Sequence, residues 1–67
     1  MKPMVIIPTY NERKNIPILV AEILSLDGGF HITIVDDNSP DGTGEVADQL
    51  EVKYRQVHVI HRAHKMG

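Results

Sequence analysis

The hydrophobic residues of the chain alternate between two periods. Short apolar runs, rich in β-branched residues, lie near residues 4–8, 31–36 and 57–60, and each predicts a strand. The first run is continuous and is closed by Pro8, which is typical of a buried strand. Near residues 15–26 apolar residues instead recur at helical spacing, which predicts one apolar helix face made of Ile16, Leu19, Val20, Ile23 and Leu24.

The ends of this first helix carry recognisable signals. Asn15 is a suitable N-cap, and Pro17 lies in the first turn, where its missing N–H costs little. Gly28 and Gly29 follow the last apolar position and are expected to stop the helix.

A second helix is predicted near residues 43–53. The turn sequence "NSPDG" precedes it, and either Asp41 or Thr43 can cap it, with Glu45 favourably placed at its positive end. Its apolar face is less regular than that of the first helix and consists of Val46, Ala47, Leu50 and Tyr54.

These elements predict an α/β fold with the order β-α-β-α-β. Right-handed crossovers of this length give a parallel three-stranded sheet, as in one half of a doubly wound nucleotide-binding fold. We treat residues 1–67 as one partial domain, because the sheet has an uncovered edge and the last strand has no helix after it. An exposed edge is a template for pairing with other chains, so self-association is expected.

Polar residues follow the first two strands at the points where these strands end. The segments "PTYNE" and "DDNSPDG" are expected to meet at the carboxyl edge of the sheet, where open α/β sheets bind ligands. The first loop, "PTYNER", has no glycine and so is not a dinucleotide phosphate cradle, and the chain has no P-loop pattern. Carboxylates accept hydrogen bonds from hydroxyl and N–H groups, and Tyr10 can stack on a base, so a ribonucleoside fits better than a bare phosphate.

Composition narrows the class of protein without identifying it. The chain has 67 residues, a net charge of −2 and no cysteine, so nucleic-acid binding, a disulfide framework and a thiolate metal site are not indicated. Its apolar runs are shorter than a membrane span, and its N-terminus does not have the pattern of a signal peptide. We therefore expect a cytoplasmic location.

Three motifs in order give the chain a family resemblance. The segments "VIIPTYNERKNI", "IVDDNSPDGTGEVADQL" and "HRAHKMG" resemble the N-terminal part of family-2 inverting glycosyltransferases, most closely the polyprenol-phosphate (dolichol-phosphate) mannosyltransferases. This resemblance implies the nucleotide-binding part of a GT-A, Rossmann-like fold. It also implies a donor-nucleotide site formed by Pro8, Tyr10, Glu12, Val35 and Asp37.

The resemblance further implies transfer of mannose from GDP-mannose to a polyprenyl phosphate lipid, at the cytoplasmic face of a membrane. Family members continue past the "KxG" segment to a D-x-D motif, which holds Mg²⁺ or Mn²⁺ with the donor diphosphate. No D-x-D occurs before Gly67. We therefore expect no catalytic residue and no metal ligand within this chain, and no transfer activity from the chain alone.

Other functions remain open from the sequence. Polyprenol-phosphate transferases for glucose or N-acetylglucosamine use UDP-sugars and share the first two motifs, and a non-catalytic remnant is a further alternative. A phospho-receiver switch also has an acid pair, but there the pair follows the first strand. Here the pair Asp36 and Asp37 follows the second strand, and no acid follows the third.

Several residues also have plainer interpretations. Asp36 and Asp37 could form a strand-ending turn, and Asp41 is better explained as a helix cap than as a ligand contact. Strand alternation puts His58 and His61 on opposite faces, so His58, His61 and His64 are interpreted as surface residues rather than metal ligands. Arg62 and Lys65 are either solvated charges or counter-charges for phosphate.

Overall fold

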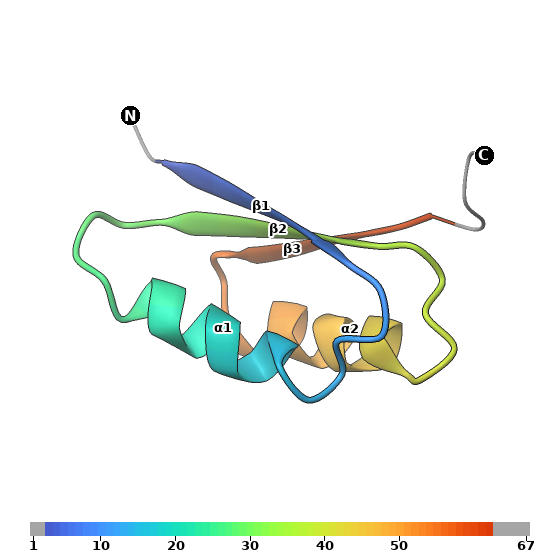
Figure 1. The fold of residues 1–67 in the computed structure, drawn as a ribbon. Coiled ribbons are helices and arrows are strands. Elements are labelled where there is room, and N and C mark those ends of the chain that lie inside the picture. Colours follow the sequence, from blue (N-terminus) through green and yellow to red (C-terminus); the bar gives the residue numbers. More distant parts are fainter. Residues whose placement is uncertain (1–2, 63–67) are drawn as a thin grey trace.

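The computed structural model describes residues 3–62. Three strands and two helices alternate along the chain, as the sequence predicts (Figure 1). In chain order they are β1 (Met4–Thr9), α1 (Ile16–Leu24), β2 (His31–Asp36), α2 (Thr43–Lys53) and β3 (Val57–His61).

The sheet is parallel throughout, which confirms the predicted topology. Its strand order is β1-β2-β3, so β2 is central and the outer strands form the edges. In the register, Pro8 is opposite Val35, and Val35 is opposite Ile60. Both helices lie on the same face of the sheet, and residues 3–62 place no element on the other face (Figure 1).

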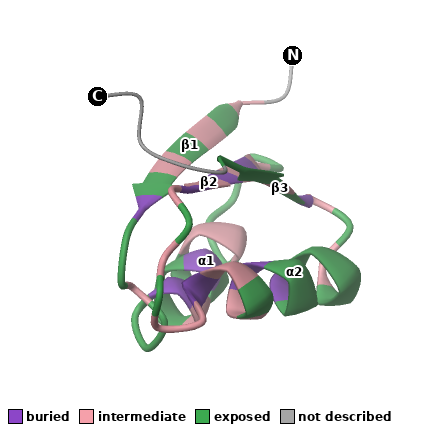
Figure 2. Cartoon of the chain, turned by 90° about the vertical axis from the view of Figure 1, so that its right-hand side faces the viewer, coloured by how far each residue is buried: buried purple, intermediate pink, exposed green. Residues whose placement is uncertain are grey.

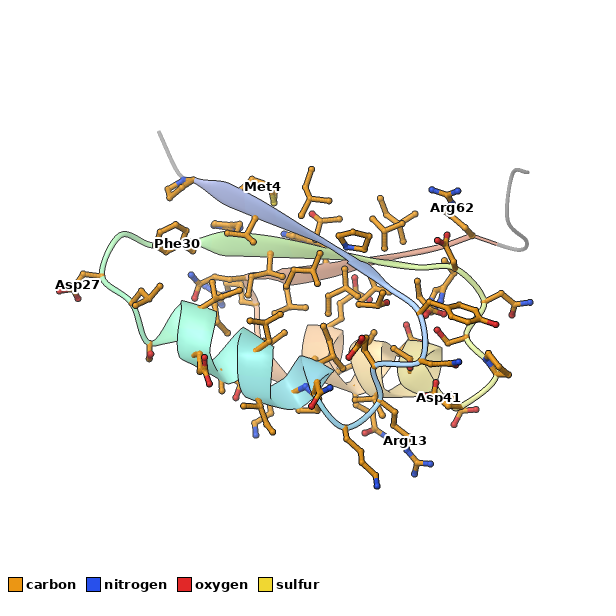
Figure 3. All side chains as sticks on the ribbon, in the orientation of Figure 1. Met4, Arg13, Asp27, Phe30, Asp41 and Arg62 are labelled. Carbon is orange, nitrogen blue, oxygen red and sulfur yellow. The ribbon has the colours of Figure 1, made fainter. Side chains whose placement is uncertain are left out.

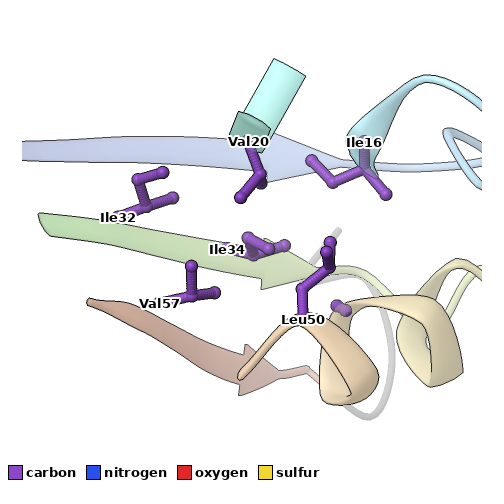
Figure 4. Close-up of a cluster of buried hydrophobic side chains, with 7 residues drawn as sticks. Ile16, Val20, Ile32, Ile34, Leu50 and Val57 are labelled. Atoms are coloured by element: carbon purple, nitrogen blue, oxygen red, sulfur yellow. The ribbon is translucent and has the colours of Figure 1, made fainter. Parts of the chain in front are cut away.

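The core lies between the sheet and the two helices. Figure 2 shows that buried residues occur both in the strands and in the two helices below the sheet. Figure 4 shows how the side chains from both layers meet in one cluster. Its buried members are Ile16, Val20, Ile32, Ile34, Ala47, Leu50 and Val57.

The expectation that the first apolar run forms a buried strand is wrong. In β1, exposed side chains alternate with partly buried ones, and Ile6 keeps 66% of its surface exposed. Only one face of the sheet is covered by helices, so every second side chain of this run points away from the core. A continuous apolar run is typical of strands that are covered on both faces, as is usual for parallel sheets.

The helix predictions are confirmed with small changes. The first helix ends at Leu24 rather than near residue 26, and Ser25 is its C-cap. Leu19 is 40% exposed and so lies outside the buried stripe on which it was expected. Both Gly28 and Gly29 have positive φ values, 132° and 65°, a conformation that favours glycine and turns the chain toward β2.

The bare face of the sheet makes self-association the expected behaviour at high concentration. We expect Ile6→Lys, on edge strand β1, to keep the chain monomeric. Burial of an isoleucine side chain is worth about 1.5–3 kcal/mol, so the association constant should weaken about tenfold or more. Sedimentation equilibrium measures this constant.

The matched control is Val52→Lys, because Val52 is 87% exposed but lies on α2, away from the sheet. A wild-type chain that stays monomeric, or equal effects of both substitutions, would contradict the prediction.

Candidate nucleotide-binding site

The two polar segments meet at the carboxyl edge of the sheet, as expected. In the register Pro8 is opposite Val35 and Thr9 is opposite Asp36. Beyond the last pair, the N–H of Asp37 donates to the carbonyl oxygen of Thr9 at 3.3 Å. The ends of β1 and β2 therefore stay paired up to the point at which both chains leave the sheet.

Pro8 and Val35 form one side of the candidate site. Strand alternation directs their side chains to the bare face, because Thr9 and Asp36, their next neighbours, are buried on the helix side. Pro8 is exposed and Val35 is half-buried. The pair provides a small apolar surface beside the strand ends, which is suited to the flat face of a base or ribose.

Tyr10 and Glu12 follow β1 in a turn that contains a left-handed residue, Asn11, with a φ of 57°. Tyr10 is exposed. The Glu12 carboxylate accepts a hydrogen bond from the Asn15 side-chain amide at 3.0 Å, and a cavity of about 260 Å³ is lined by both Pro8 and Glu12. The structure thus brings Glu12 to the α1 side of Pro8.

Asn15 is the N-cap residue of α1, as predicted, but its side chain does not cap the helix. The backbone of Glu12 connects the loop after β1 with the start of α2, because its N–H donates to the Thr43 hydroxyl at 2.9 Å. This contact joins residues far apart in the sequence, and no local pattern could have revealed it.

The two adjacent aspartates have different structural roles. Asp36 is 2% exposed, and its carboxylate accepts hydrogen bonds from Ser39, from the hydroxyl at 2.6 Å and from the backbone N–H at 3.2 Å. The Thr9 hydroxyl lies 3.4 Å from the same carboxylate. For Asp36 the interpretation as a strand-ending turn is therefore correct.

Asp37 faces the other side of the sheet. Its Oδ1 atom lies 2.8 Å from Nε of Arg62, with the Asp37 side chain 22% exposed and the Arg62 side chain 45% exposed. Figure 3 shows Arg62 at the carboxyl edge of the sheet, on the side away from Arg13 and Asp41. Arg62 is therefore the ion-pair partner of Asp37 rather than only a solvated charge.

Asp41 lies just before α2 but does not cap it, so the prediction that Asp41 or Thr43 caps this helix is wrong: no side chain makes a cap hydrogen bond at its N-terminus. The Asp41 carboxylate accepts hydrogen bonds from the N–H and the hydroxyl of Thr43, and from the N–H of Arg13 at 3.3 Å. The N-cap position itself is taken by Gly42, with a left-handed φ of 92°. The hydrogen bond from the Thr43 hydroxyl is the main cause that holds the pKa of Asp41 below its usual 3.8.

One cavity near the strand ends lies on the helix side of the sheet. Its volume is about 600 Å³, and it is bounded by the loop between β2 and α2, the first turns of α2, and His61. None of the five residues predicted to bind nucleotide lines it. Gly44 borders this cavity, and a Cβ there would come within 2.9 Å of Asp36 Oδ2. The first turn of α2 can therefore lie against Asp36 only because residue 44 has no side chain.

The described histidines lie on opposite faces of the sheet, as predicted. His58 stacks on His31 on the bare face, with ring centroids 5.9 Å apart, while Nε2 of His61 lies 2.7 Å from Asp48 Oδ1 of α2. His64 and Lys65 lie outside the described residues.

The carboxylates of the site do not fit a divalent cation. Asp36, Asp37 and Asp41 are each matched with hydrogen-bond donors or a positive charge, whereas a cation site keeps its oxygen ligands free for the metal. Within residues 3–62 no group of three or more acidic, histidine or cysteine side chains is placed to hold a metal ion. In the same residues neither helix has the length and apolar character needed to cross a bilayer.

Comparison with known proteins assigns the class. The model of the family described as "Glycosyl transferase family 2" matches residues 4–67. The chain belongs to this family, which confirms the resemblance seen in the sequence.

Similar relatives have names that agree with the closer resemblance. The chain is 49% identical to a polyprenol monophosphomannose synthase of Mycolicibacterium smegmatis, with 98% of this chain and 25% of that protein covered. It is 40% identical to an undecaprenyl-phosphate mannosyltransferase of Micrococcus luteus, with 100% and 28% covered. It is 49% identical to a dolichol-phosphate mannosyltransferase of Pyrococcus furiosus, with 100% and 19% covered. The chain thus spans 19–28% of the lengths of these relatives.

One solved structure has the same fold over the whole chain. It is a mannosyltransferase from Pyrobaculum calidifontis in complex with GDP-Man and Mn²⁺, with a TM-score of 0.83. The match covers 100% of this chain and 21% of that one at 24% sequence identity, and we use it as support for the fold alone.

The hydrogen bonds to Asp41 predict how acid affects the fold. A carboxyl group whose pKa is lowered by folding stabilises the folded state above its unfolded pKa, here 3.8, and this contribution is lost as the pH falls through the lower, folded value. We expect the free energy of unfolding of Asp41→Asn to fall less steeply with acid than that of the wild type below pH 3.8. Urea unfolding over a pH series measures both slopes. Asp27→Asn, in an exposed loop, controls for the lost charge. Equal acid slopes for wild type and Asp41→Asn would contradict the role of Asp41.

Proposed function

We propose that the chain is the donor-nucleotide-binding portion of a glycosyltransferase that transfers mannose from GDP-mannose to a polyprenyl phosphate. The whole protein acts, in this proposal, in the cytoplasm at the cytoplasmic face of a membrane, since its acceptor is a lipid phosphate. The chain itself supplies nucleoside contacts. Mg²⁺ or Mn²⁺, when bound with the donor, supplies positive charge at the diphosphate through ligands that we expect outside residues 3–62.

One observation carries the proposal more than any other. The register places Pro8 opposite Val35 at the ends of adjacent strands, and Asp37 is hydrogen-bonded by its backbone to Thr9 directly beyond them. Residues from two motifs that are far apart in the sequence therefore lie together at the edge where open α/β sheets bind nucleotides. The names of the three relatives support mannose as the sugar.

The five residues supply three kinds of contact in the proposal. Pro8 and Val35 form an apolar surface under the nucleoside, and the exposed Tyr10 ring covers a base from the other side. Glu12 and Asp37 accept hydrogen bonds from the N–H groups of a base edge or from ribose hydroxyls. Asp37 lies directly beyond the paired ends of β1 and β2, so we choose it for the test.

A titration of the isolated chain with GDP and with UDP tests the proposal. Without contacts to the diphosphate, we expect millimolar binding, on the order of 4 kcal/mol. Asp37→Asn keeps the shape but replaces an acceptor by a donor. The loss of a charge-assisted hydrogen bond costs roughly 1.5–3 kcal/mol, so binding should weaken about tenfold or more. Chemical shifts of backbone amides report both binding and location.

The matched control is Asp48→Asn, which removes one carboxylate from the 600 Å³ cavity and leaves Asp37 intact. We expect this variant to bind GDP as the wild type does. Shifts around Asp48 with none at residues 8–12 and 35–37, or equal affinities of wild type and Asp37→Asn, would contradict the proposed site. Stronger binding of UDP than of GDP would favour a UDP-sugar donor instead.

A further inference from the structure

The contact between Arg62 and Asp37 is placed where it can control the candidate ligand site. Arg62 follows β3 directly, and its backbone N–H donates to the carbonyl oxygen of Asp36 at 2.8 Å. Strand pairing therefore continues one step past His61, and the Arg62 backbone is held beside the end of β2. Because side chains alternate along a strand, the Arg62 side chain emerges on the face opposite to His61, the face of Asp37.

The two carboxylate oxygens of Asp37 are not in the same environment. Oδ1 is buried, accepts no hydrogen bond from the described residues, and has the Arg62 charge 2.8 Å away as its compensation. A buried carboxylate oxygen without a hydrogen bond is costly, so the arginine fixes which oxygen is turned inward. The remaining oxygen is then available to a ligand at the carboxyl edge of the sheet.

We propose that Arg62 is a positioning residue for the nucleotide site: it holds Asp37 Oδ1 and thereby presents the other oxygen to the ribose or base. This inference rests on the proposed function. The guanidinium acts through Asp37 and makes no contact with the nucleotide phosphates. The Nε atom of Arg62 holds the Asp37 carboxylate in one orientation before the ligand binds. The carboxylate therefore does not have to be ordered during binding.

The alternative role for this arginine is direct recognition of phosphate, and the two roles differ in what they do to guanosine. If Arg62 acts through Asp37, its loss weakens the binding of guanosine and the binding of GDP by the same factor. If Arg62 binds phosphate, its loss weakens the binding of GDP and leaves that of guanosine unchanged. Because the ion pair is partly exposed, we expect Arg62→Gln to weaken the binding of both ligands about two- to fivefold. Arg62→Lys keeps the charge and should recover part of the loss.

The experiment is a chemical-shift titration of the 67-residue chain with guanosine, GDP and pyrophosphate. Arg55→Gln is the matched control, because this exposed arginine precedes β3 at the opposite edge of the sheet. A second readout needs no ligand: the Nε–H resonance of Arg62 should move in Asp37→Asn and stay in place in Asp48→Asn.

Equal weakening of guanosine and GDP by Arg62→Gln, partial rescue by lysine and no effect of Arg55→Gln would support the inference. Weakening of GDP alone, a response of the Arg62 resonance to pyrophosphate, or unchanged affinities would overturn it. These failures are distinct from failure of the proposed function, which would appear as a wild-type chain that binds neither GDP nor guanosine while the resonance of Arg62 still depends on Asp37.

Discussion

The arrangement of the site depends on the hydrogen bonds that the buried carboxylate of Asp36 accepts. It binds the hydroxyl and N–H of Ser39 and so closes the turn after β2, and it lies close to Thr9 of β1. The backbone carbonyl oxygen of Asp36 accepts a hydrogen bond from the N–H of Arg62, just beyond β3. Because Gly44 has no side chain, the first turn of α2 can lie against the Asp36 carboxylate. One residue therefore connects all three strand ends with the start of the second helix.

This use of Asp36 leaves Asp37 available on the other face. In an extended chain, neighbouring side chains point to opposite sides of the sheet, so one carboxylate supports the turn from the helix side while the next borders the bare side. There it lies near the surface of Pro8 and Val35, with Arg62 against one of its oxygens. The two adjacent aspartates therefore serve opposite faces of the sheet: Asp36 supports the turn, and in our proposal Asp37 binds the nucleoside.

Much of the fold could be predicted from local pattern, because period and turn residues determine where elements begin and end. The range of α2 and the parallel pairing followed from "NSPDG" and the lengths of the crossovers. Exposure of Ile6 could not be predicted, since burial depends on a layer that the local sequence does not specify. The contacts of Glu12 with Thr43 and of Asp37 with Arg62 join distant residues, and strand alternation was the one signal that could have separated Asp36 from Asp37.

The most direct measurement of this division compares the free energies of unfolding of Asp36→Asn and Asp37→Asn by urea denaturation. Asp36→Asn leaves buried donors without a charged acceptor and should lower the free energy of unfolding by about 1.5–3 kcal/mol. Asp37→Asn breaks only a partly exposed ion pair and should cost less than about 1 kcal/mol. Equal losses, or a larger loss for Asp37→Asn, would contradict the account, because both aspartates would then serve the fold.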